Sequence, residues 1–105
     1  MALITWNKSI ASSTTEDITL VAADTAGRKN KVRAVNLTFS GTITVQFKRG
    51  STALGGAMEF SNGGSLVLGP EQCGGLQSAA DESLVLSVAR TSGSVRGNVD
   101  GVTDF

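Results

Sequence analysis

Hydrophobic and polar residues alternate along most of this chain, most clearly in residues 31–48. The apolar positions there are Val35, Leu37, Phe39, Ile43, Val45 and Phe47. Strict alternation is typical of strands with one buried face. A three-residue loop with Gly41 in the left-handed conformation would put both apolar rows on the same face of one sheet. The pattern therefore predicts a hairpin that pairs Leu37 with Ile43 and Val35 with Val45.

A second alternating pair of segments occupies residues 84–99. The positions in its apolar rows are Leu84, Leu86, Val88, Val95, Gly97 and Val99. A four-residue loop would pair Leu86 with Gly97 and Leu84 with Val99, so that every inward residue meets an inward partner. We therefore predict a second hairpin here. Because Gly97 has no side chain, we also expect a kink or the close approach of another strand at this position.

Shorter apolar segments fill the rest of the chain. They predict strands at residues 16–22, 57–60 and 65–68, the last two joined by a Ser-Asn-Gly-Gly turn. The basic run at residues 28–33 is interpreted as the exposed start of a strand, and residues 78–81 offer at most one helical turn. About eight short strands, each bounded by Gly, Ser or Asn, predict an all-β fold with little or no helix. We expect a compact antiparallel β-sandwich or jelly roll.

The chain is divided into residues 1–15 and residues 16–105. The longer part predicts a single β-sandwich domain, because 105 residues suit one core. The shorter part holds an apolar segment, with Leu3, Ile4 and Trp6, and then a spacer rich in Ser and Thr. It predicts either an edge strand, with Trp6 covering one end of the sandwich, or an arm that leaves the domain and docks on a neighbour.

Charge and composition exclude several classes of function. Nine Lys and Arg balance nine Asp and Glu, and His is absent. Proteins that bind nucleic acid through phosphate contacts carry a basic excess, so no nucleic acid partner is expected. No apolar run approaches the length that spans a bilayer, so no membrane partner is expected either. The basic residues concentrate in the first half and the acidic residues in the second, which indicates solvated loops and edges or a dipolar surface that pairs with another subunit.

The residue types needed for catalysis are scarce. Without His, the usual zinc sites and the Ser-His or Cys-His nucleophiles cannot form within one chain. The lone Cys73 excludes an internal disulfide and is interpreted as an inert loop or small-core thiol, in a protein that folds in a cytoplasm. Asp100 and Asp104 could ligate calcium, but their spacing matches no calcium loop. One Trp and no Tyr make a poor platform for sugars. We expect no enzyme activity, no metal and no other cofactor.

Three segments carry a resemblance to a known group of proteins. They are residues 45–58 (VQFKRGSTALGGAM), 62–64 (NGG) and 79–86 (AADESLVL). A strand ends in Phe and a basic residue, a Gly-Ser-Thr-x-Leu-x-Gly loop follows, a glycine pair precedes a short apolar strand, and a small-residue turn leads into the last apolar segments. This order is similar to that of small β proteins encoded in the structural gene clusters of tailed bacteriophages.

The resemblance implies a virion structural protein of the capsid decoration, or cement, type on the capsid surface. Such proteins often sit as trimers over junctions between major capsid subunits and grip the shell through an N-terminal arm or a loop. We therefore expect a homo-oligomer, with a trimer favoured, that binds the major capsid protein through Leu3, Ile4 and Trp6. A tail or baseplate module and a ligand-binding module, for example for glycans, are the alternatives.

Overall fold

The computed structural model describes residues 3–23, 27–69, 73, 76–78 and 82–104. Within these ranges the chain forms strands and no helix, hence no helix of a length and apolarity that would cross a membrane. The strands are β1 (Leu3–Ser12), β2 (Glu16–Val21), β3 (Lys29–Ser40), β4 (Ile43–Arg49), β5 (Thr52–Phe60), β6 (Gly64–Leu68), β7 (Leu84–Arg90) and β8 (Ser94–Asp104). The helical turn predicted for residues 78–81 falls largely on residues outside the described ranges.

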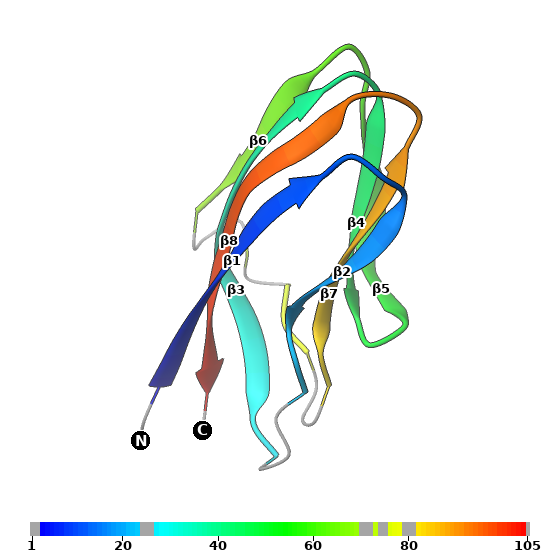
Figure 1. Ribbon diagram of the computed structural model, residues 1–105. Coiled ribbons are helices and arrows are strands. Elements are labelled where there is room, and N and C mark those ends of the chain that lie inside the picture. The colour runs from blue at the N-terminus through cyan, green and yellow to red at the C-terminus, as the bar shows by residue number, and fades with distance from the viewer. Residues whose placement is uncertain (1–2, 24–26, 70–72, 74–75, 79–81, 105) are drawn as a thin grey trace.

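The strands form two four-stranded antiparallel sheets that pack against each other (Figure 1). One sheet has the order β1-β8-β3-β6 and the other the order β2-β7-β4-β5. Each of the first four strands therefore pairs with a partner from the second four in reverse order: β1 with β8, β2 with β7, β3 with β6 and β4 with β5. This is the strand order of a jelly roll. The predicted all-β sandwich is confirmed.

Both predicted hairpins are wrong, because the paired segments lie in different sheets. β3 pairs with β6 and β8, whereas β4 pairs with β5 and β7. Similarly, β7 pairs with β2 and β4, whereas β8 pairs with β1 and β3. Alternation requires only that every second residue faces the core. A chain that crosses from one sheet to the other meets this requirement as well as a hairpin does.

The one hairpin between consecutive described strands joins β4 to β5. Arg49 pairs with Thr52, and Gly50 has a positive φ of 55° in the two-residue loop. The sequence had indicated only a polar loop here. The predicted strands at residues 57–60 and 65–68 do exist, as the end of β5 and most of β6. The turn between them crosses to the other sheet, however, so these two strands do not pair.

The apolar rows of both sheets meet in one core. Its fully buried side chains include Val35, Leu37, Ile43, Val45, Leu84, Leu86, Val88, Val95 and Val99. Phe39 of β3 stacks on Phe60 of β5, with ring centroids 4.1 Å apart and planes 7° apart. Each fully buried side chain of this size contributes about 1.5 to 3 kcal/mol. The core is thus mainly aliphatic, and this one aromatic stack links the two sheets.

The close approach predicted at Gly97 is confirmed, but the neighbour is β3 and not Leu86. Gly97 pairs with Leu37 in the register of β3 and β8 and has a φ of +145°. A Cβ at this position would overlap the carbonyl oxygen of Asn36. Only glycine adopts this backbone conformation readily and leaves room for the neighbouring strand.

The prediction that residues 28–33 form an exposed strand start is wrong for Asn30 and Val32, which are buried. Three bonds hold the Asn30 side chain. Its Nδ2 donates to the carbonyl oxygens of Ala22 (3.1 Å) and Glu82 (3.0 Å), and its Oδ1 accepts from Thr103 Oγ1 (2.6 Å). Asn30 therefore connects the segment after β2, the segment before β7 and the end of β8.

Candidate functional site

The three predicted partner-binding residues all lie on β1, which the structure places in a sheet. Ile4 is 47% exposed. Trp6 is half-buried and packs against the core. Leu3 begins the strand opposite Asp104, and its side chain is outside the described part. In this arrangement Trp6 contacts its own domain, while Ile4 faces solvent.

β1 is a long and regular edge strand. It pairs with β8 over all ten of its residues without a register shift, and no described strand pairs with its other side. It contains no Pro and one charged residue, Lys8. An edge of this kind presents a row of backbone N–H and C=O groups to which a further strand can bind.

The other three edge strands carry features that discourage pairing. β2 begins with Glu16 and Asp17 and has a register shift between Thr19 and Val21. β5 pairs with β4 through a shift in register, and β6 has only five residues. Charge, bulges and short length all weaken an edge as a template for another strand. Among the described edges, β1 is therefore the one best suited to adding a strand.

The connection from β1 to β2 is held by side-chain hydrogen bonds. The hydroxyls of Ser12 and Thr14 both donate to the Glu16 carboxylate, each at 2.7 Å. These bonds favour the ionised form and lower the pKa of Glu16 below its ordinary value. The end of β1 is thus tied to the start of β2, across the two sheets.

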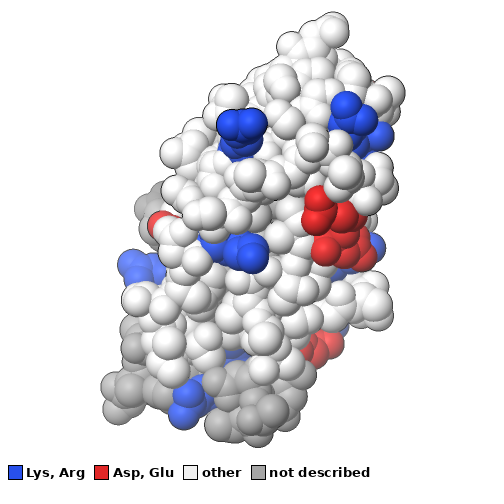
Figure 2. All heavy atoms as spheres, viewed as in Figure 1, with Lys and Arg blue, Asp and Glu red and all other residues white. Residues whose placement is uncertain are grey.

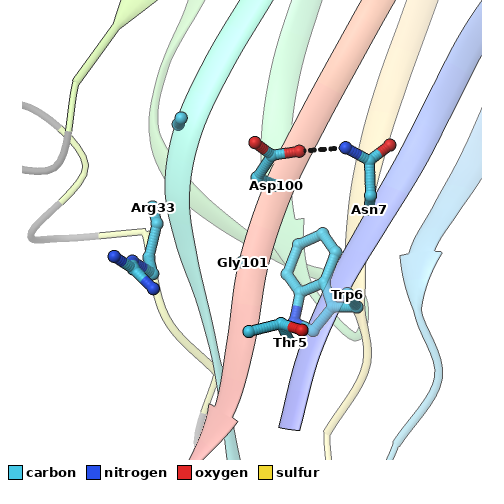
Figure 3. Close-up of a pocket in the computed structure, with 7 residues that line it drawn as sticks. Thr5, Trp6, Asn7, Arg33, Asp100 and Gly101 are labelled. Carbon is cyan, nitrogen blue, oxygen red and sulfur yellow. Dashed lines mark hydrogen bonds between the residues drawn. The ribbon is translucent and has the colours of Figure 1, made fainter.

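A hollow of about 490 Å³ lies over β1, β8 and β3 (Figure 3). Its lining residues are Thr5, Trp6, Asn7, Arg33, Ala34, Asp100 and Gly101. Asn7 Nδ2 donates a hydrogen bond to Asp100 Oδ1 across the two neighbouring strands. A Cβ at Gly101 would overlap the Trp6 ring, so glycine gives the indole its place beside β8. The Trp6 ring and Gly101 face the core, whereas Asn7 and Asp100 face the other side of the sheet. The side-chain groups of the hollow are therefore an amide, a carboxylate and a guanidinium group.

Sequence reasoning singled out Trp6 and Asp100 separately and did not bring them together. The two residues lie on neighbouring strands because β1 and β8, at opposite ends of the chain, are antiparallel neighbours in which Trp6 pairs with Gly101 and Asn7 with Asp100, and their side chains are on opposite faces of the sheet. A prediction of the hollow needed this register. The alternation within either strand does not indicate this register, because alternation shows which face of a strand is buried and not which strand pairs with it.

Trp6 also carries a polar atom with no hydrogen bond. Its Nε1 is buried and finds no acceptor among the residues that the structure describes. A buried donor without a partner costs about 1 to 3 kcal/mol. The position of the indole is therefore set by its packing against Gly101 and the core, and not by a polar contact.

The described residues contain no group of three or more His, Cys, Asp and Glu side chains that could hold a metal ion. Cys73, predicted to be a loop or small-core thiol, is 3% exposed and belongs to the core cluster. Burial raises the pKa of its thiol above the ordinary value of 9.0, so the reactive thiolate is disfavoured. Of the two predicted calcium ligands, Asp100 is bound to Asn7, and the Asp104 side chain is outside the described part.

Charges of opposite sign are interspersed on the surface. Arg49 Nη1 lies 3.3 Å from Glu82 Oε1, which joins a basic residue of the first half of the chain to an acidic residue of the second. On the face shown in Figure 2, the basic side chains are separated from one another and the acidic ones gather mainly at one place. Strands from both halves alternate in each sheet, so the division of charge along the chain does not produce two oppositely charged sheets.

The arrangement is suited to binding through two features, the free edge of β1 and the adjoining hollow. Both use residues of β1, since Thr5, Trp6 and Asn7 line the hollow. Comparisons with protein-family models, with curated proteins and with solved structures return no match. Function is therefore inferred from these two features and from the resemblance carried by the sequence.

Proposed function

We propose that this protein is a non-enzymatic structural component of a virion, a capsid decoration protein that self-associates and stabilises the lattice of the major capsid protein. The observation that carries this proposal is the free edge of β1. The strand offers ten residues of backbone and the exposed Ile4 side chain. A strand added there would satisfy the backbone groups and cover Ile4. The resemblance to phage structural proteins suggests the assembly, a homotrimer on the capsid surface.

The estimated free energies indicate that a contact through the β1 edge is strong only when it is repeated over the capsid lattice. A fully paired ten-residue edge forms about ten hydrogen bonds, each contributing about 0.5 to 1.5 kcal/mol net. Covering Ile4 adds part of the roughly 1.5 to 3 kcal/mol of a fully buried Ile. Association costs about 4 to 15 kcal/mol. One edge contact is therefore modest by itself, and repetition around a trimer and over a capsid raises the overall affinity.

The three residues of β1 would have different roles in this contact. Ile4 is exposed and would touch the partner directly. Trp6 packs against its own core and would hold β1 in position instead. Leu3 lies next to Ile4 at the start of the strand and would extend the contact along it.

The test is the mass of the purified protein in solution, together with its binding to capsids that lack it. We expect a mass above the 10.7 kDa of one chain, three times that value for the trimer, and co-sedimentation with assembled shells but not with free capsid subunits. Ile4→Lys should lower both, because a charged edge residue opposes pairing. Thr19→Lys, which places the same charge on the edge strand β2, is the matched control and should change neither.

A deletion of residues 1–15 would not test the role of the β1 edge. It would remove the whole of β1, including the buried Ile10, and expose β8. A strict monomer at every concentration, with no binding to shells, would refute the proposal. So would Ile4→Lys and Thr19→Lys variants that associate and bind as the wild type does.

A further inference from the structure

We propose that the strand added to β1 comes from another protein and carries two opposite charges on its outward row, an acidic residue beside Ala11 and a basic residue beside Asn7. This inference rests on the strand addition proposed above and names the chemistry of the partner. In the proposed assembly, the added strand would be an extended segment of the major capsid protein. The observation behind it is the pair of charges that β8 places next to the free edge of β1.

β8 carries an acidic and a basic residue on the outer face of its sheet. Asp100 pairs with Asn7 of β1, and Arg96 pairs with Ala11. Both charged residues alternate with β8 residues that are buried in the core, so their side chains face away from it. Asn98 lies between them and is uncharged. The two charges are about 13 Å apart along the strand, so the sheet is negative at one place beside the edge and positive at another.

Both charges can reach a strand at the free edge. Asn7 Nδ2 donates a hydrogen bond to Asp100 Oδ1, and Figure 3 shows the carboxylate directed towards β1. Arg96 is exposed, and the small side chain of Ala11 leaves room for the guanidinium above β1. An added strand would lie two strand spacings, about 10 Å, from β8. A long side chain on the added strand can cover much of this distance, as it does in diagonal pairs within sheets.

The neighbouring basic residues do not cancel this pattern. Arg33 lies on β3, and Figure 3 shows it on the far side of Asp100 from Asn7. A partner residue at the β1 edge is therefore closer to Asp100 than to Arg33. Lys8 belongs to the core-facing row of β1, because it pairs with the buried Val99. A basic residue beside Asn7 thus meets the carboxylate first, and Lys8 does not oppose it on the same face of the sheet.

A second copy of this chain fits the charge pattern less well. The outward row of β1 has no charge from Thr5 to Ala11. Among the other described edge strands, the charges of β2 are both acidic, β5 has Glu59 alone and β6 has none. None of these strands offers an acidic and a basic residue four positions apart. A contact between two copies through β1 would therefore lack these ion pairs, whereas a segment of a different protein can form them.

The order of the two charges along the partner strand follows from its direction. Antiparallel pairs are slightly more stable than parallel ones, and β1 is already antiparallel to β8. In an antiparallel partner the residue beside Ala11 precedes the residue beside Asn7. The acidic residue therefore comes first and the basic residue four positions later. On the inward row, apolar residues of the partner would cover the exposed Ile4 and the half-buried Trp6.

The test compares two peptides of the same length as β1. The uncharged peptide has Thr throughout, except for Val at the seventh and ninth positions, which would face Trp6 and Ile4. The charged peptide differs only in Glu at the second position and Lys at the sixth, which would face Ala11 and Asn7. We would titrate the full chain with each peptide and follow the amide chemical shifts of β1.

The charged peptide should bind about tenfold more tightly than the uncharged one at about 0.01 M salt, because each exposed ion pair contributes about threefold. At about 1 M salt the two affinities should be equal, since exposed charges are then screened within about 3 Å.

Two variants identify the charges responsible. Asp100→Asn keeps an acceptor for the Asn7 amide, and Arg96→Gln keeps a long polar side chain. Each should lower the advantage of the charged peptide about threefold. Asp17→Asn, which removes an exposed carboxylate from β2 in the other sheet, is the matched control and should leave the advantage unchanged. The uncharged peptide should bind the wild type and all three variants equally, which checks that β1 stays folded.

Three results would overturn the proposal. The first is that the charged peptide leaves the chemical shifts of β1 unchanged. The second is equal affinity of the two peptides at low salt, which would refute the charge pattern and leave strand addition intact. The third is an advantage of the charged peptide that the Asp100→Asn and Arg96→Gln variants retain in full. The assembly role is tested separately, by the solution mass and capsid binding of the Ile4→Lys variant.

Discussion

Replacing Asn30 by Ala should be among the most damaging single substitutions in this protein. Asn30 is fully buried, and its side chain forms hydrogen bonds with Ala22, Glu82 and Thr103. Its backbone adds two more bonds, from its N–H to Ser78 Oγ (3.0 Å) and from the Ser78 N–H to its carbonyl oxygen (2.8 Å). The side chain thus binds three segments far apart in the sequence, and Asn30→Ala removes all three of these bonds at once.

The expected cost is about 3 to 4 kcal/mol. A hydrogen bond contributes about 0.5 to 1.5 kcal/mol net, and a buried group left without a partner costs about 1 to 3 kcal/mol. The Thr103 hydroxyl would be left buried, whereas water can reach the partly exposed carbonyls more easily. Since a domain of this size is stable by about 5 to 15 kcal/mol, the loss is a large part of the total.

The assay is urea unfolding at equilibrium, with the free energy extrapolated to water. Asn36→Ala is the matched control, because Asn36 lies on the same strand with an exposed side chain and should cost less than about 0.5 kcal/mol. Thr103→Val keeps the shape and removes one bond, so we expect about 1 to 2 kcal/mol. Combined with Asn30→Ala, it should cost less than the sum of the two, because both remove the same bond.

The reasoning is refuted if Asn30→Ala costs less than about 1 kcal/mol or no more than Asn36→Ala. Additive effects of Asn30→Ala and Thr103→Val would also contradict it, since they would mean that the 2.6 Å contact contributes nothing to stability.

Two further predictions concern glycine and cysteine. Gly97→Ala should destabilise the protein by more than about 2 kcal/mol, because it adds a clash with the Asn36 carbonyl to backbone strain of about 1 to 3 kcal/mol. Gly55→Ala, also at positive φ but with nothing within 4 Å, should cost only the strain, and equal losses in urea unfolding would contradict this account. Burial raises the pKa of Cys73 in the folded state above 9.0. The stability that comes from keeping this thiol neutral is therefore complete below pH 9.0 and is lost as pH rises further. Between pH 8 and pH 10 the wild type should therefore lose more stability than Cys73→Ala, and parallel pH profiles would show that the thiol does not titrate as expected.

The sequence indicated the strands of this fold far better than their partners. Alternation identified buried rows in β3, β4, β7 and β8, because the packing of a sheet face on a core imposes a period of two. It assigned the wrong neighbours, since β3 and β4 satisfy the same period in opposite sheets. Pairing of distant strands depends on how the whole chain wraps, which a local pattern does not record.

The candidate site could be predicted only as separate residues. Trp6 was recognised as a conspicuous apolar residue and Asp100 as a possible ligand, but only the register of β1 against β8 shows that Asp100 lies beside Asn7 and that Trp6 lies over Gly101. Asn30 was missed for another reason. Asn is mostly exposed in proteins, so its place within a basic run suggested the surface. Its burial becomes reasonable only when Thr103 and the carbonyl oxygens of Ala22 and Glu82 are seen around it.

The reversed pairing of strands also suggests an order of folding. The β4–β5 hairpin closes a loop of two residues, whereas β3–β6, β2–β7 and β1–β8 close progressively longer ones. The entropy lost on closure grows with loop length. Strand pairing would therefore begin at the hairpin and continue with the strands that precede and follow it in the sequence. A topology with so many distant pairings is expected to fold slowly, in milliseconds to seconds. β1 would dock last, which makes the strand with the free edge the final one to enter the sandwich.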